Sequence, residues 1–141
     1  MPEEQAEIKV LTLEEANASL PQVKVILKSL RELRDKVLRI QAQIEIEEMT
    51  GANSEGLLSL SAQKAVALQM SEFQAQTQHF EALLKELFDL GAHLKDLNIG
   101  LIDFFSLRNK EMVLLCWKEG EPEIQHWHTL EGGFQNRQRL D

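Results

Sequence analysis

The chain has 141 residues, the length of one domain, and 43% of them are hydrophobic, which excludes a disordered tail. A net charge of -8 argues against binding to duplex nucleic acid or to an anionic membrane surface, because both need many Lys and Arg contacts. The single cysteine, Cys116, excludes an internal disulfide. The sequence contains neither a secretory signal nor an apolar run that could span a membrane. We therefore expect a cytoplasmic protein.

The N-terminal region predicts a strand and then a short helix. Residues 8–11 are a short stretch that is apolar except at Lys9, and they are interpreted as a strand. The Thr12-Leu13-Glu14-Glu15 segment matches a capping box, in which the Thr hydroxyl and the Glu carboxylate each accept a backbone N–H bond. We therefore predict a short helix near 13–18.

A long helix is predicted from about 20 to 48. Pro21 would clash with a helix that continued through it, whereas it is tolerated in the first turn of a new one. The Ser19-Leu20-Pro21-Gln22 segment supplies a second capping box for this start. Apolar residues then recur at spacings of three and four, at Val23, Ile26, Leu30, Leu33, Val37, Ile40 and Ile44. This heptad stripe predicts packing against a partner helix in the manner of a coiled coil.

A second long helix is predicted from about 58 to 90. It follows a turn-rich break at residues 50–56, and Gly91 is expected to cap its C-terminus. Its stripe has the same spacing and consists of Val66, Met70, Phe73, Thr77, Phe80, Leu84 and Leu87. Two helices of similar length joined by a short loop should form an antiparallel hairpin.

The hairpin is expected to associate with a second hairpin. A two-helix hairpin leaves much of its apolar stripe exposed, and further apolar residues widen the stripe, at Leu27, Leu68, Leu83 and Phe88. Packing of two hairpins would bury these residues. The sequence therefore predicts a homodimeric four-helix bundle.

From residue 92 onward the pattern becomes extended. Strands are predicted at residues 99–104, at 112–117 as the central strand, and at 123–128 as the outer strand of a hairpin. A short polar tail is expected at 135–141. The fold class predicted is α+β in a single domain, residues 1–141, with a helical hairpin at 12–91 and an antiparallel β-meander at 92–141.

Two histidines indicate a metal site as one interpretation of the last strand. His126 and His128 lie two residues apart, so a strand would place both imidazoles on one face. Asp103, Glu121 and Cys116 are the candidates for a third ligand of a transition metal. The alternative is that His128 forms a structural hydrogen bond while His126 is solvated.

Other residues of this region also have two interpretations. Cys116 lies in an apolar strand and is expected to be a small buried hydrophobe, since a reactive thiolate needs exposure and positive neighbours. Trp117 and Trp127 either line a binding surface or pack the meander onto the helices. Asp103 interrupts an apolar strand, so it needs a partner such as Arg137 or a histidine, in a structural ion pair or as a poised acid.

Several short motifs at both ends of the chain form a recognisable set. They are Leu11–Asn17 with Leu20-Pro21, Gly100–Phe104, Leu115-Cys116-Trp117, Gly120-Glu121-Pro122, Trp127-His128 and Gly133–Arg137. Together they resemble an uncharacterised bacterial family, domain of unknown function 2203. The resemblance implies no activity, but it marks as motif positions Asp103, Cys116, Trp117, Glu121, Trp127, His128 and Arg137.

The functional expectation rests on two matched helical stripes and no catalytic motif: GxxxxGK(S/T), GxGxxG, CxxC, HExxH and GxSxG are all lacking. We expect a dimeric protein-interaction or scaffold module rather than an enzyme, without a cofactor, whose C-terminal face binds a protein partner through Asp103, Trp117, Glu121, Trp127, His128 and Arg137. The alternative is a small metal-binding protein or enzyme that uses His128 with His126 and Asp103, Glu121 or Cys116.

Overall fold

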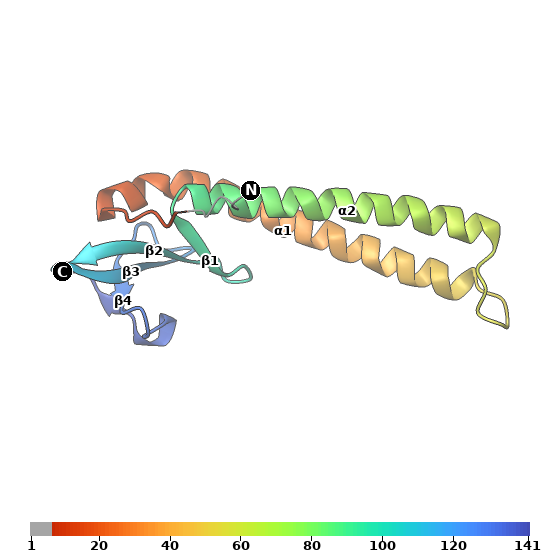
Figure 1. Ribbon diagram of the computed structural model, residues 1–141. Coiled ribbons are helices and arrows are strands. Elements are labelled where there is room, and N and C mark those ends of the chain that lie inside the picture. The colour runs from red at the N-terminus through yellow and green to blue at the C-terminus, as the bar shows by residue number, and fades with distance from the viewer. Residues whose placement is uncertain (1–6) are drawn as a thin grey trace. The chain divides into compact units, whose positions relative to one another are not determined.

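The computed structural model describes residues 7–141. The expectation that the N-terminus carries no secretory signal concerns residues outside this range. Within the described residues, two long helices precede an antiparallel sheet (Figure 1), which confirms the predicted α+β class. The elements are α1 (Leu13–Thr50), α2 (Leu60–Asp89), β1 (Ala92–Asp96), β2 (Leu101–Arg108), β3 (Glu111–Lys118), β4 (His126–His128), the 3-10 turn η1 (Phe134–Asn136) and β5 (Gln138–Arg139). Neither helix contains an apolar stretch that could cross a membrane.

Helix α1 is continuous over 38 residues, so the predicted break before Pro21 is wrong. A proline within a helix removes one backbone hydrogen bond and strains the preceding turn. Tertiary contacts offset this loss, because Ala16 and Leu20 are buried and the N–H of Ile124 donates to Asn17 Oδ1 at 2.8 Å. The turns on the N-terminal side of the proline are therefore fixed by packing and by a bond to a distant loop.

The start of α1 has the predicted capping box. The Thr12 N–H donates to Glu15 Oε1 at 2.9 Å, and the Glu15 N–H donates to Thr12 Oγ1 at 3.1 Å. Hydrogen bonding to the carboxylate by Thr12, through its backbone N–H and then its side chain, lowers the pKa of Glu15. The strand expected at 8–11 is wrong: these residues are irregular, although the Leu11 N–H donates to the Phe105 carbonyl of β2 at 2.8 Å.

The connection between the helices, residues 51–59, confirms the predicted turn-rich break. Gly51 packs so closely against α2 that an added Cβ would lie 2.4 Å from Ala62 Cβ, so the position requires glycine. Asn53 Oδ1 accepts the N–H groups of Glu55 and Leu57 at 2.9 and 3.0 Å, which closes the turn. The predicted cap at Gly91 is also confirmed, with φ at +89°.

The chain divides into two compact units, one with residues up to Lys28 together with Leu84–Asp141, the other with Ser29–Leu83. The prediction of a single domain stays a prediction. In the Ser29–Leu83 unit, Leu33 and Ile40 are buried between the helices, but several stripe residues are only half-buried: Val37, Ile44, Val66, Phe73, Thr77 and Phe80. Met70 is 58% exposed. Two helices alone therefore leave part of the stripe open to solvent.

The sheet is a meander in the order β1-β2-β3-β4-β5, with every neighbouring pair antiparallel. The predicted central strand is β3, which confirms its position. The outer strand predicted at 123–128 is shorter than expected, since β4 contains only His126–His128. It is not an edge strand, because β5, which lies within the expected polar tail, pairs with it. Strand β1 on the opposite edge was not predicted.

The apolar side of the sheet faces the N-terminal turns of α1. It carries Ile102, Phe104, Leu115 and Trp117, which are at most 4% exposed. The Nζ atom of Lys24 on α1 lies 6.0 Å from the centroid of the Trp117 ring, so this side packs against the helix. Because side chains alternate along a strand, the residues between these ones point to the opposite side of the sheet.

Candidate metal centre

A row of polar side chains crosses the sheet on the side away from α1. The register places them directly opposite one another on five successive strands, as His93, Asp103, Cys116, His126 and Arg139. Directly paired residues share one face of an antiparallel sheet. Three residue types that carry acid–base or metal chemistry, His, Asp and Cys, are therefore aligned by strand pairing alone.

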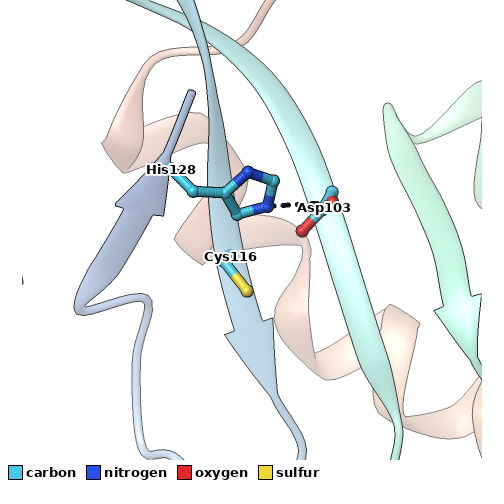
Figure 2. A group of neighbouring side chains, drawn as sticks. All are labelled: Asp103, Cys116 and His128. Atoms are coloured by element: carbon cyan, nitrogen blue, oxygen red, sulfur yellow. Dashed lines mark hydrogen bonds and ion pairs between the residues drawn. The ribbon is translucent and has the colours of Figure 1, made fainter. Parts of the chain in front are cut away.

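Three buried side chains converge within this face (Figure 2). Asp103 comes from β2, Cys116 from β3 and His128 from β4, and their ligand atoms all lie within 4.8 Å of one another. Asp103 is 4% exposed, His128 2% and Cys116 fully buried. His128 reaches diagonally across β3, since the register pairs it with Leu114. Its Nε2 atom lies 3.2 Å from Asp103 Oδ2.

The hydrogen bonds around His128 define its neutral tautomer. Its Nδ1 atom lies 2.7 Å from the Thr129 carbonyl oxygen, which can only accept, so Nδ1 carries a proton. In the neutral ring, Nε2 then presents a lone pair to the Asp103 carboxylate. The other carboxylate oxygen, Oδ1, is buried and has no hydrogen-bond partner among residues 7–141. Buried acceptors rarely stay without a donor or a cation.

Cys116 is not suited to act as a nucleophile. Burial and, after it, the Asp103 carboxylate raise the pKa of its thiol, Arg137 opposes them, and together they bring the pKa to about 12. Reactive cysteines have lowered pKa values and exposed sulfur atoms. His128 is not poised to serve it as a base, because its Nδ1 atom faces the Thr129 carbonyl and its Nε2 atom faces Asp103.

A second polar cluster lies beside the first. The Arg137 Nη1 and Nη2 atoms donate to Glu121 Oε1 and Oε2 at 3.1 and 2.9 Å, and the Lys118 N–H donates to Oε1 at 2.7 Å. Burial alone would raise the pKa of Glu121, but these donors and the charges of Arg137 and His126 together lower it. This pair anchors the segment before β5 to the turn after β3.

His126 belongs to the second cluster rather than to the first. Its Nδ1 atom lies 3.4 Å from Glu121 Oε2, and the three-residue group that could hold a metal does not include it. His126 and His128, which were expected to act as a pair, therefore belong to different clusters, although both side chains point to the same side of the sheet. Asp103 replaces His126 beside Cys116 and His128, and Arg137 pairs with Glu121 instead of Asp103.

The two tryptophans lie on the side of the sheet that faces the helices. Trp117 is fully buried and its Nε1 atom donates to the Glu121 carbonyl at 2.9 Å. Trp127 is half-buried, and the Arg108 guanidinium carbon lies 4.9 Å from the centroid of its ring. The histidines and the tryptophans of the expected binding face thus lie on opposite sides of the sheet.

His93, for which no role was predicted, flanks the first cluster. Its ring makes edge contacts with Phe88 and Phe105, at centroid distances of 5.5 and 5.0 Å, and its Nε2 atom is buried without a partner among the described residues. Burial lowers the pKa of His93, Lys95 adds to this, and Asp103 opposes it. No local signal in the sequence marks this residue, because its place beside the cluster follows from the pairing of β1 with β2, in which His93 lies opposite Asp103.

Comparison with protein families identifies the chain. A family model described as an uncharacterized conserved protein, DUF2203, matches residues 9–140, so the chain belongs to this family. The resemblance seen in the motifs is therefore confirmed. Comparisons with curated proteins and with solved structures give no match.

Proposed function

We propose that this member of the DUF2203 family binds one transition-metal ion, preferentially zinc, between Asp103, Cys116 and His128. The observation that carries the proposal is the convergence of three buried ligand atoms within 4.8 Å of one another. In addition, the Oδ1 atom of Asp103 is buried and has no hydrogen-bond partner among the described residues. The proposal revises the ligand set expected from the sequence, with Asp103 in the place of His126.

The orientation of His128 supports a cation at this position. Two acceptors, the lone pair of Nε2 and Asp103 Oδ2, lie only 3.2 Å apart and repel each other unless a cation or a proton lies between them. Histidine ligands of metals commonly donate their second N–H to a backbone carbonyl, as His128 does to Thr129. A proton on Nε2 would relieve the repulsion too, but Asp103 Oδ1 would still lack a hydrogen-bond partner among residues 7–141.

The charges of the cluster suit a divalent ion. An Asp103 carboxylate and a Cys116 thiolate together neutralise two positive charges, and Arg137 favours the thiolate. A coordinating metal deprotonates a thiol even where burial disfavours the thiolate. The adjacent Glu121–Arg137 pair has no net charge. Metal binding would therefore leave no uncompensated charge in the buried cluster.

Mixed nitrogen, sulfur and oxygen ligands favour zinc among the available ions. Zinc–ligand distances of about 2.0–2.3 Å place the atoms of a tetrahedron roughly 3.3–3.8 Å apart. The 3.2 Å separation of His128 Nε2 and Asp103 Oδ2 already approaches this range. The fourth position is left for a water molecule or the second oxygen of Asp103. Because the ligands are buried, we assign the ion a structural role that joins β2, β3 and β4.

Cobalt and zinc titrations test the proposal. Protein stripped of metal with a chelator should bind one equivalent of Co²⁺ with a thiolate-to-cobalt charge-transfer band, which Zn²⁺ then displaces. Cys116→Ser should abolish the band, whereas His126→Gln, two residues from His128 on the same strand, should retain it. Zinc at 100 times its Kd should stabilise the wild type by about 2.7 kcal/mol.

Two results would refute the metal site. One is wild-type protein that gives neither the charge-transfer band nor a thermal shift with either ion. The other is a band of full intensity in Cys116→Ser, which would place the ion elsewhere. In the first case Asp103 and His128 form a buried ion pair, and the cluster is structural without a metal.

A further inference from the structure

A second row of residues with heptad spacing runs along α1 beside the buried stripe, within the Ser29–Leu83 unit. Its members are spaced 3, 4, 3, 4 and 3 residues apart: Arg31, Arg34, Leu38, Gln41, Glu45 and Glu48. At 3.6 residues per turn they share one side of the helix, offset from the residues buried against α2. Hence α1 presents two separate stripes.

The charges in this row are antisymmetric about its centre. Two arginines lie at one end, Leu38 and Gln41 occupy the middle, and two glutamates lie at the other end. A copy of the row laid alongside in parallel would place like charges together. A copy laid antiparallel would place each arginine beside a glutamate, so the row is complementary to itself in that orientation alone.

Apolar surface at the centre of the row supports docking of another chain. Leu38 is 56% exposed, and beside it lies a groove of about 160 Å³ lined by Arg34, Val37, Leu38, Thr77 and Phe80. Met70 lies 58% exposed on the stripe of α2 that includes Thr77 and Phe80. Exposed apolar residues grouped around a groove with a charged margin are typical of interaction surfaces.

We infer that this row docks against the same row of a second copy of the chain, antiparallel, about a two-fold axis between Leu38 and Gln41. Arg34 then meets Glu45 of the partner subunit, and Arg31 meets Glu48 of the partner subunit. A two-fold interface repeats each contact, which gives four ion pairs around two central leucines. Arg34 also lies 3.4 Å from Asp35, an exposed pair that contributes little and can persist in the dimer.

Charge reversal with rescue tests this arrangement. The acidic variant, Arg31→Glu with Arg34→Glu, makes the row negative throughout, and the basic variant, Glu45→Lys with Glu48→Lys, makes it positive throughout. Each variant alone should dimerise roughly ten to a hundred times more weakly than the wild type, because four modest pairs become repulsive. An equimolar mixture should form a heterodimer that restores the wild-type affinity.

The matched control changes the same amount of charge on the other side of the helix. Lys36→Glu with Arg39→Glu alters two exposed residues that face away from the row, and it should dimerise as the wild type does. Light scattering after size exclusion distinguishes the 16.1 kDa chain from a species of twice that mass. Circular dichroism verifies that each variant keeps its helices.

Three outcomes would overturn the inference. The first is wild-type protein that remains monomeric from micromolar to sub-millimolar concentration, in which case a different protein would have to cover this face. The second is an acidic variant that associates as strongly as the control variant. The third is a mixture of acidic and basic variants that associates no better than either alone. None of these outcomes bears on the metal centre, which lies in the other unit of the chain.

Discussion

The substitution Glu121→Gln should lower the free energy of unfolding, because Glu121 joins three parts of the sheet region. Its carboxylate accepts two bonds from Arg137 and one from the Lys118 N–H, and its carbonyl accepts the Trp117 indole N–H. Glutamine keeps the size of the side chain but removes its charge. Its amide NH₂ would also face a guanidinium that can only donate.

The burial of the pair sets the size of the effect. The Glu121 and Arg137 side chains are 17% and 18% exposed. Breaking a fully buried ion pair costs about 3–5 kcal/mol, whereas exposed pairs contribute about 0–1 kcal/mol. A pair that is mostly buried but still reached by water should lie between these limits, at about 2 kcal/mol. For a chain of this length that loss corresponds to a fall in Tm of roughly 6–8 °C.

Urea unfolding followed by tryptophan fluorescence measures this loss, since Trp117 is fully buried and bonded to Glu121. The matched control is Glu123→Gln, an exposed glutamate in the same turn, which should change stability by less than about 0.5 kcal/mol. Equal unfolding midpoints for the two variants would refute the assigned role of Glu121.

The pH dependence gives an independent check. The pKa of Glu121 is lowered in the folded state from the 4.5 expected without contacts. The ionised group therefore contributes stability above pH 4.5, and this contribution is lost as the pH falls through the lower folded pKa. The stability difference between wild type and Glu121→Gln should shrink over that range. A difference that stays constant down to strongly acidic pH would contradict the charge-based explanation.

Three further changes test other parts of the fold. Gly91→Ala should lower the free energy of unfolding by about 1–3 kcal/mol, because φ is +89° and the new Cβ would lie 2.8 Å from Leu11 Cδ1. Asn17→Ala should lower it by about 1–3 kcal/mol, because the buried Ile124 N–H loses its acceptor. In the folded protein Cys116 should not react with a thiol reagent at mildly alkaline pH, because it is fully buried and its pKa is about 12.

Each of these predictions has a control and a contrary outcome. The control for Gly91→Ala is Gly120→Ala, because Gly120 also has a positive φ, +107°, but no atom lies within 4 Å of the added Cβ. Gly120→Ala should therefore lower the free energy of unfolding by less than Gly91→Ala does. Equal losses would exclude the clash with Leu11. The control for Asn17→Ala is Gln22→Ala, which removes an exposed amide side chain from the same helix. If the two variants lose the same free energy of unfolding, the bond between Asn17 and Ile124 is excluded as the cause. Denatured protein should react with the thiol reagent at once, whereas rapid reaction of the native thiol would place Cys116 near the surface.

The sequence predicts those features that depend on local periodicity. The two helices follow from stripes with a spacing of three and four, and β3 follows from an apolar run. The continuity of α1 through Pro21 could not be predicted, because it depends on a bond between Asn17 and a loop more than a hundred residues away. Strand β5 was missed because it has only two residues and exists through pairing with β4.

The candidate site was predicted as a set of residues but not as a geometry. The motif residues include Asp103, Cys116 and His128 but not His126, yet the strand pattern alone does not distinguish the two histidines as ligands. That distinction depends on where Glu121 and Arg137 lie in the folded sheet. Register is a property of strand pairs, so a sequence without assigned strand pairs cannot supply it.

The bond between Asn17 and Ile124 has a consequence for synthesis on the ribosome. Its two residues are 107 positions apart, and at roughly 5–20 residues per second the acceptor waits about 5–20 s for its donor to be translated. During this interval the first turns of the nascent helix, with Ala16 and Leu20, lack the sheet that covers them. This N-terminal segment is therefore where a chaperone would engage the emerging polypeptide, and where a translational pause before residue 124 would prolong exposure.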